Sequence, residues 1–265
     1  MKIYRTLYQT YGPRRWWPGE TPFEVMVGAI LTQHTSWKNV EKAIQNLRGK
    51  GALNSERIHQ LRKSQLAFMI KPSGYYRIKA DRLKAFVGFL FEEFDGDVKK
   101  MGKESLKELR QKLLDVKGIG PETADSILLY GLGKPIFVVD TYTKRIFSRH
   151  GIISEKAPYE EIQNLFMNHL SIDVKLFNEY HALIVHLGKT VCKKIPGCDR
   201  CPIQGIGHSN IKSQYPNPKF QINCNTQYSK HFYCLEFGNW LLFDYWCLVI
   251  GYLLWEITGK KRFGV

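Results

Sequence analysis

The amino-acid sequence predicts an all-α fold. Apolar residues recur at helical spacing from residue 23 to residue 187, and no run before the C-terminal tail alternates between apolar and polar residues as a half-buried strand does. Glycine and proline mark clear breaks at 72–74, 95–97 and 131–135. These observations indicate helices joined by short turns.

The expected helices follow one another along the chain. Two apolar faces come first, formed by Phe23, Val27, Ile30 and Leu31 and then by Val40, Ala43, Ile44 and Leu47. Helical patterns then recur at about 56–70, 77–94, 104–116, 122–131, 141–150, 158–170 and 174–187.

The composition favours a protein that binds a polyanion. A chain of 265 residues can bury a substantial core and forms one or two compact domains. Its 39 Lys and Arg residues outnumber the 24 Asp and Glu residues, which gives a formal net charge of +15. Judged on charge alone, a solvated basic surface is the alternative.

The most informative segment lies at 113–125, with the sequence LLDVKGIGPETAD. An apolar helix runs into a tight Gly-Ile-Gly turn, and a second helix starts at once. Such a hairpin presents backbone N–H groups to an anion, and the helix N-terminus adds its dipole. On a strongly basic chain the natural anion is a nucleic-acid phosphate. We therefore expect nucleic-acid contacts from Lys117, Gly118, Ile119, Gly120 and Thr123.

The hairpin is followed by a Gly-Leu-Gly-Lys-Pro loop at 131–135 and by Asp140. In order and spacing these features resemble the helix-hairpin-helix, Gly/Pro-loop, aspartate (HhH-GPD) superfamily of DNA glycosylases, whose best-known member is endonuclease III. The resemblance covers roughly residues 15–203 and implies two helical subdomains with the active site in the cleft between them. The implied division is a helical barrel domain at 22–132, a second helical domain of 1–21 plus 133–204 with a Cys-rich loop, and an atypical tail at 205–265.

Asp140 is the main catalytic candidate that the resemblance implies. Cleavage of an N-glycosidic bond builds positive charge on the sugar, and a nearby carboxylate can stabilise that charge or activate water. Aspartate is also favoured at helix N-caps, so the alternative is that Asp140 only caps the helix that begins at Thr141. Both roles are compatible.

Position 122 determines the expected reaction subtype. Relatives that also cut the DNA strand place a lysine here as Schiff-base nucleophile. This chain has Glu122, which cannot form an imine, so we expect a monofunctional glycosylase that leaves an abasic site. Glu122 either orients water or contacts the base, or it is an ordinary first-turn glutamate that complements the helix dipole.

An aromatic segment suggests which base is removed. Arg14-Arg15-Trp16-Trp17-Pro18, followed by residues 23–37, resembles the 3-methyladenine DNA glycosylase branch of the superfamily. An alkylated purine is cationic, and indole rings hold cations as well as stack on bases. We expect the flipped base to lie against Trp16, Trp17 and Trp37, the alternative being that some of these residues belong to the core.

The resemblance implies two further sites. Gln33 and His34 fall where relatives place a side chain that fills the gap left by the extruded base, unless they are simply polar residues at a helix end. Cys192, Cys198 and Cys201 resemble the cysteine run that binds a [4Fe–4S] cluster. The fourth cysteine is replaced by Gly207, so His208 or Cys224 completes the site, or the site is vestigial or binds zinc.

The expected partner is double-stranded DNA with a damaged base, bound by a monomer. The rival hypotheses are a non-catalytic DNA-binding module and a glycosylase for oxidised or mismatched pyrimidines. Met1 leads into polar sequence without a secretory signal, which favours a cytoplasmic or nucleoid-associated protein. The apolar stretch at 240–255 is about 16 residues long, short of the usual ~20-residue span. A membrane anchor, a core element and an altered reading frame all stay open for it.

Overall fold

The structure is a computed structural model that describes residues 1–14 and 19–207, all within one compact unit. These residues form helices and turns with no β-strand among them, apart from an isolated bridge between Cys192 and Pro196. The predicted all-α fold is confirmed. In this part of the chain no helix is both long and apolar enough to cross a membrane. The apolar stretch at 240–255 lies outside the described residues.

The described helices follow the chain from Lys2 to Arg200. The α-helices are α1 (Lys2–Tyr11), α2 (Pro22–Leu31), α3 (Trp37–Gly49), α4 (Ser55–Gln60), α5 (Lys63–Met69), α6 (Tyr76–Phe94), α7 (Val98–Lys103), α8 (Leu106–Asp115), α9 (Pro121–Ser126), α10 (Thr141–Arg149), α11 (Tyr159–His169) and α12 (Val174–Thr190). The shorter elements are the 3-10 turns η1 (Lys71–Ser73) and η3 (Cys198–Arg200) and the π-helical segment η2 (Ile127–Gly131).

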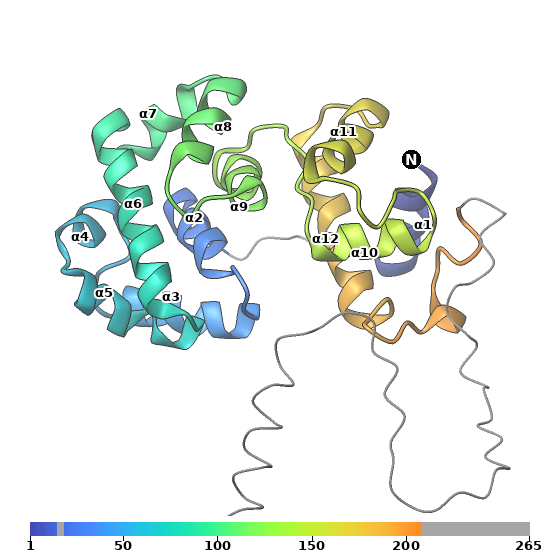
Figure 1. Cartoon of the computed structure of the whole chain (residues 1–265), viewed down its shortest axis with the longest axis horizontal. Coiled ribbons are helices and arrows are strands. Elements are labelled where there is room, and N and C mark those ends of the chain that lie inside the picture. Colours follow the sequence, from blue (N-terminus) through green and yellow to red (C-terminus); the bar gives the residue numbers. More distant parts are fainter. Residues whose placement is uncertain (15–18, 208–265) are drawn as a thin grey trace, which may run out of the picture. The chain divides into compact units, whose positions relative to one another are not determined.

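The helices form two groups, which Figure 1 shows side by side. In the first group α6 is central and contacts α2, α4, α5 and α7. In the second group α12 packs between α1 and α10. The segment η2 continues α9 and touches both α2 and α12, so it joins the two groups. The boundaries of the two predicted subdomains, 22–132 and 1–21 plus 133–204, stay a prediction.

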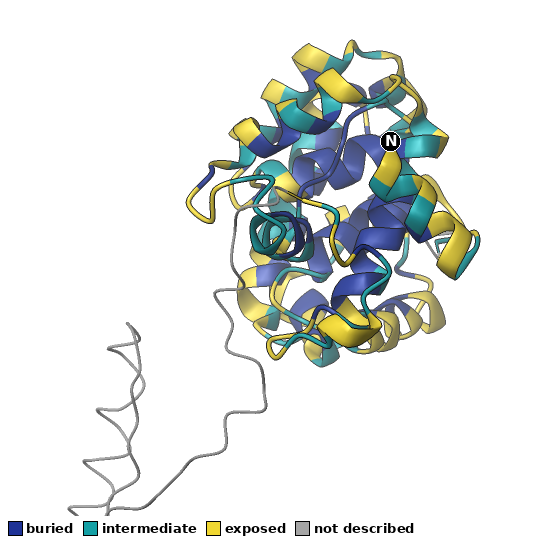
Figure 2. Ribbon diagram, turned by 90° about the vertical axis from the view of Figure 1, so that its right-hand side faces the viewer, coloured by how far each residue is buried: buried dark blue, intermediate teal, exposed yellow. Residues whose placement is uncertain are grey.

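Burial of apolar helix faces holds each group together. The inner face of α6 is fully buried at Leu83, Phe86 and Leu90, and the exposed residues of the helices face outward (Figure 2). In the second group the ring of Phe137 stacks on Phe166 with centroids 3.9 Å apart. Each such side chain contributes about 1.5–3 kcal/mol on burial, and these residues belong to one continuous core that dominates the stability of the fold.

Some helix boundaries differ from the sequence pattern. The expected helix at 56–70 is interrupted, because Leu61 and Arg62 adopt extended backbone conformations between α4 and α5. The N-terminal helix α1 and the short helix α7 were not predicted. The expected helix at 122–131 is α9 followed by the π-helical segment η2, a type of segment often found at functional sites.

Close packing of α10 on α12 depends on Gly188. A Cβ atom at this position would lie 2.4 Å from Cδ1 of Tyr142, which is closer than two carbon atoms can approach. Glycine therefore lets the first turn of α10 lie directly against α12. Arg145 secures the same contact by donating to the carbonyl of Gly188 at 2.9 Å. This packing places Asp140, the N-cap of α10, beside α12.

Part of the basic charge is used inside the fold. Lys79 is only 1 % exposed, and its ammonium group donates to the carbonyls of Leu31 and Ser73 at 2.8 and 2.6 Å. Burial, reinforced by the nearby charge of Arg82, lowers the pKa of Lys79 to about 8. Lys79 thereby ties the turn after α2, which carries His34, to the turn before α6, which carries Tyr75.

Candidate active site

Asp140 occupies the N-cap of α10. Its Oδ1 atom accepts hydrogen bonds from the backbone N–H of Thr143 at 2.7 Å and from the Thr143 hydroxyl at 2.8 Å. Its Oδ2 atom lies 3.6 Å from Nε2 of His181 on α12. Asp140 therefore caps α10 through Oδ1 alone, and Oδ2 is free to interact with another group.

The ionisation of Asp140 is favoured despite its burial. Only 10 % of its side chain is exposed, and burial alone would raise its pKa. The attraction of His181 and the two hydrogen bonds from Thr143 outweigh this effect and lower the pKa of Asp140 below its usual value. Asp140 is thus a charged carboxylate in a low-dielectric setting, the form that stabilises a developing positive charge.

Glu122 lies in the first turn of α9, close enough to Asp140 for their charges to interact. Desolvation of its carboxyl group, with a further contribution from the negative charge of Asp140, raises the pKa of Glu122 to about 7. His181 acts in the opposite direction. Solvent still reaches Glu122. The structure therefore brings together two carboxyl groups with pKa values shifted in opposite directions, a pattern common in acid–base active sites.

Sequence reasoning missed two members of this cluster. His181 is 5 % exposed, and its Nδ1 atom lies 2.5 Å from the hydroxyl of Tyr130 on η2. The only signal in the sequence is a histidine on the apolar face of α12 between Phe177 and Ile184, a pattern equally typical of a core histidine. Tyr130 sits in an apolar run and gave no signal at all.

The hairpin between α8 and α9 is held by the turn after α2. The Gln33 amide donates to the carbonyl of Gly118 at 3.1 Å and to the hydroxyl of Thr123 at 2.9 Å. Its Oε1 atom accepts from Arg82. Arg82 packs where a Cβ of Gly118 would lie, and Gly118 has a φ of 89°, so glycine is needed at this turn.

The hairpin residues predicted to contact nucleic acid differ in their exposure to solvent. Lys117, Gly118 and Gly120 are exposed, as an anion-binding turn requires. Ile119 and Thr123 are both buried, so their side chains fix the hairpin and only their backbone can reach a nucleic acid.

His34, rather than Gln33, projects from the turn after α2. It is exposed and has a left-handed φ of 52°, whereas the Gln33 side chain is engaged by the hairpin. Tyr75, which precedes α6, is 70 % exposed and also left-handed, with a φ of 44°. Strained, exposed side chains of this kind cluster at functional sites. Tyr75 was not predicted, because the sequence gives no indication of its backbone conformation.

The predicted aromatic pocket is described only in part. Trp37 is the first residue of α3, half-buried and packed against the hydrophobic core. Trp16 and Trp17 lie outside the described residues. Arg14, just before them, donates its backbone N–H to the carboxylate of Glu179 on α12 at 2.5 Å.

The Cys-rich loop follows α12 and is fixed by arginines of α10. Arg149 donates to the carbonyls of Lys193 and Lys194 and lies 3.4 Å from Sγ of Cys192. Cys192 is buried, Cys198 is exposed and Cys201 is half-buried, and all three are free thiols.

These thiols are three of the four ligands that the predicted cluster needs. Among the described residues no three His, Cys, Asp or Glu side chains form a group that could hold a metal ion. At the position of the fourth cysteine, a Cβ on Gly207 would lie 2.3 Å from the carbonyl oxygen of His150. The described residues alone therefore do not fit a four-ligand cluster. Because His208 and Cys224 lie outside them, the [4Fe–4S] cluster stays a prediction.

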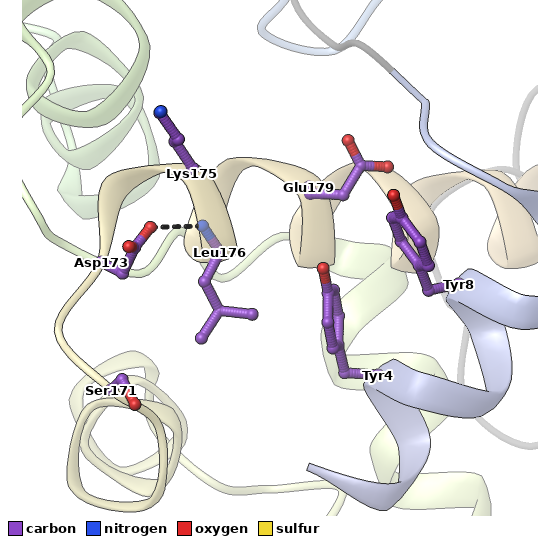
Figure 3. Close-up of a pocket in the computed structure, with 7 residues that line it drawn as sticks. All are labelled: Tyr4, Tyr8, Ser171, Asp173, Lys175, Leu176 and Glu179. Atoms are coloured by element: carbon purple, nitrogen blue, oxygen red, sulfur yellow. Dashed lines mark hydrogen bonds between the residues drawn. The ribbon is translucent and has the colours of Figure 1, made fainter.

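A separate hollow lies between α1 and the start of α12 (Figure 3). Tyr4 and Tyr8 stand on one side, facing Glu179, while Asp173 caps α12 by accepting from the N–H of Leu176 at 2.8 Å. The other lining residues are Ser171 and Lys175. No member of the Asp140 cluster lines this hollow, and its carboxylates are engaged in local contacts. It is therefore not the candidate active site.

Known proteins resemble this chain along most of its length. A protein of Methanocaldococcus jannaschii assigned as a DNA repair glycosylase is 49% identical over 205 residues, which cover 77% of this chain and 93% of that protein. Endonuclease III of Thermotoga maritima is 32% identical over 181 residues, which cover 68% and 79% of the two chains.

Solved structures extend the comparison. The H. pylori 3-methyladenine DNA glycosylase MagIII, bound to 1,N6-ethenoadenine, is 31% identical with a TM-score of 0.61, covering 71% of this chain and 96% of that one. A non-covalent endonuclease III–DNA complex is 20% identical with a TM-score of 0.68, covering 78% and 92%, and shows the same two-subdomain helical fold. The family model described as HhH-GPD superfamily base excision DNA repair protein matches residues 27–171, which hold the hairpin, Glu122 and Asp140. The chain thus belongs to this superfamily, and it is a DNA glycosylase of the endonuclease III-like type.

Proposed function

We propose that the protein removes an alkylated purine such as 3-methyladenine from duplex DNA by hydrolysis, without cutting the strand. The observation that carries the proposal is the pairing of a charged, largely buried Asp140 with the solvent-accessible Glu122, close enough for their charges to interact. The resemblance to MagIII, whose structure holds 1,N6-ethenoadenine, supports a purine substrate.

Asp140 performs the central step in this proposal. As the glycosidic bond breaks, the electron pair leaves with the base and positive charge develops on the sugar. The charged Oδ2 atom of Asp140 stabilises that charge, and a water molecule then attacks the sugar carbon and gives up one proton to solvent. Glu122 cannot form an imine with the resulting abasic site, so the strand stays intact.

Recognition of the duplex is assigned to the exposed turns. The backbone of the Gly118–Gly120 hairpin and Lys117 hold a phosphate, while His34 and Tyr75 enter the base stack from two turns that Lys79 ties together. The flipped base then lies against Trp16 and Trp17, with Trp37 as the third aromatic residue of the predicted pocket.

Base release from defined duplexes tests the proposal. Duplexes that carry 3-methyladenine, 7-methylguanine, thymine glycol or a G·T pair are incubated with the enzyme, with and without alkali. We expect release of the methylated purines, with strand breaks only after alkali. Strand breaks without alkali would contradict the role of Glu122. Release from thymine glycol or G·T alone would assign a pyrimidine substrate instead.

The pKa of Glu122 near 7 predicts a pH dependence. Glu122 is protonated below this pH and ionised above it, and only the ionised form can orient water or attract a cationic base. We therefore expect kcat/KM for 3-methyladenine release to rise about tenfold between about pH 6 and pH 8. Glu122→Gln should flatten this rise. A rate that falls over the same range would show that Glu122 acts as an acid.

Replacement of His34 or Tyr75 by alanine should weaken duplex engagement. A stacked side chain contributes about 1–3 kcal/mol per base, so each variant should lose about tenfold in affinity for lesion-containing duplex. Ile172→Ala is the matched control, because Ile172 is 59 % exposed and lies between α11 and α12. Fluorescence anisotropy measures all three. Equal affinity of the His34 and Tyr75 variants with the control would remove these turns from the DNA interface.

A further inference from the structure

The buried imidazole of His181 has one nitrogen with a partner and one without. Nδ1 lies 2.5 Å from the hydroxyl of Tyr130, whereas Nε2 makes no hydrogen bond. Nε2 instead lies 3.6 Å from Oδ2 of Asp140, just beyond hydrogen-bond distance. A buried polar atom without a hydrogen bond is costly, so its position beside a carboxylate calls for an explanation.

The two oxygens of Asp140 have different surroundings. Oδ1 is held by the backbone and hydroxyl of Thr143, as an N-cap requires. Oδ2 faces His181. The carboxylate is thus fixed at one oxygen by α10 and approached at the other by α12.

Tyr130 determines which nitrogen of His181 carries the proton. Burial and the negative charges of Asp140 and Glu122 raise the pKa of Tyr130 well above 10, so the phenol keeps its proton. A phenol O–H beside Nδ1 donates to it, and a neutral imidazole that accepts at Nδ1 must carry its proton at Nε2. The π-helical segment η2 places Tyr130 at this position.

We propose that Tyr130 and His181 are positioning residues for Asp140. The Tyr130 hydroxyl holds the His181 ring through Nδ1, and the N–H at Nε2 orients Oδ2 of Asp140 and keeps this carboxylate ionised. The inference rests on the proposed function, because it gives Asp140 the catalytic role. Neither positioning residue needs to touch the DNA.

This arrangement predicts a separate acid limb, set by Asp140, that lies at lower pH than the rise assigned to Glu122 and is seen alone when Glu122 is replaced. Asp140 must be ionised for base release, and the groups that face it are Glu122 of α9, Tyr130 of η2, Thr143 of α10 and His181 of α12. Glu122 disfavours the ionised form, whereas His181 and Thr143 favour it. Loss of His181 should therefore move the acid limb to higher pH.

Single-turnover base release as a function of pH tests the proposal. The variants His181→Leu, His181→Gln and Tyr130→Phe are made in a Glu122→Gln background, which removes the second carboxyl titration. We expect His181→Leu to shift the acid limb to higher pH and to lower the plateau rate about tenfold, because Oδ2 of Asp140 loses the group that orients it. Tyr130→Phe should shift it less, and His181→Gln, which keeps an N–H donor, should restore part of the rate.

His186→Gln is the matched control, since His186 lies on the same helix and packs edge-on against Tyr11 with centroids 4.6 Å apart. It should leave the acid limb unchanged. A lower plateau with an unmoved acid limb in the His181 variants would reduce His181 to a packing role. An unmoved limb in Tyr130→Phe would remove Tyr130 from the arrangement.

Direct titration of the Asp140 carboxyl carbon by NMR makes the result independent of catalysis. The pKa of Asp140 should be higher in Tyr130→Phe and His181→Leu than in the unmodified protein, and an unchanged value would overturn the proposal. If the unmodified enzyme released no base from any lesion, the proposed function would fail, while the titration would still decide the roles of Tyr130 and His181.

Discussion

Asp140→Asn should abolish base release while leaving DNA affinity and folding intact. Loss of the carboxylate removes the charge that stabilises the developing positive sugar, an effect of roughly 10²–10⁴ in rate. Asparagine is nearly as good an N-cap as aspartate, so its side-chain oxygen can still accept from Thr143 and preserve α10. Single-turnover release of 3-methyladenine, anisotropy with lesion-containing duplex and thermal unfolding measure the three properties.

Asp173→Asn is the matched control for this experiment. Asp173 caps α12 in the same manner, accepting from the N–H of Leu176 at 2.8 Å, but is exposed and lies outside the Asp140 cluster. Its variant should keep full activity. If the unmodified protein and Asp140→Asn bound DNA equally and were equally inactive on every lesion, Asp140 would be only a cap. The protein would then act as a DNA-binding module.

Much of the fold could be predicted from local patterns. The apolar spacing gave α6, α10, α11 and α12 to within a few residues, because each buries one continuous face. The break between α4 and α5 was missed, since apolar residues keep their helical spacing across Leu61 while the backbone there is extended. A spacing rule responds to side chains and contains no information on backbone conformation.

The candidate site was predictable only where residues lie in one motif. Glu122 and Asp140 belong to the hairpin and loop that the resemblance covers, so their proximity followed from it. His181 lies 41 residues beyond Asp140 and joins it only because α12 packs against α10 at Gly188. That contact is a property of tertiary packing. A histidine on an apolar helix face gives no sign of what it will face across the interface.

Tertiary contacts also distinguish Gln33 from His34. In the sequence both are polar residues at the end of a helix, and either could enter the DNA. In the structure Arg82 and the hairpin engage the Gln33 side chain. The backbone of His34 is left-handed, and the His34 side chain is exposed. Partners 49 and 85 residues away thus decide the role of Gln33.

Asp125 connects the hairpin helix to the segment that leads to Asp140. It is fully buried, and its carboxylate accepts from Arg110 at 2.7 and 3.1 Å and from the hydroxyl of Tyr159 at 2.8 Å. The Gln163 amide donates both to Asp125 and to the carbonyl of Phe137, each at 2.7 Å. One buried charge therefore organises α8, α9, α11 and the approach to Asp140.

Asp125→Ala should be the most destabilising single substitution considered for this protein. It leaves the Arg110 charge without its buried partner and two further donors unsatisfied, which costs about 3–5 kcal/mol of unfolding free energy. Asp95→Ala, which removes an exposed partner of Lys100, should cost far less, because solvent screens this pair. Urea unfolding of both variants provides the comparison.

The stability loss separates two views of this network. If Asp125 anchors the hairpin to the segment before Asp140, its variant should also lose base release under conditions where it is still folded, because Phe137 and Val139 lose their fixed positions. If Asp125→Ala cost no more than Asp95→Ala, the network would be incidental and the hydrophobic core alone would position Asp140. The stacked rings of Phe137 and Phe166 alone would fix the segment before Asp140 less strictly, because apolar contacts allow the rings to slide. The bidentate Arg110–Asp125 pair has a defined geometry and does not allow this.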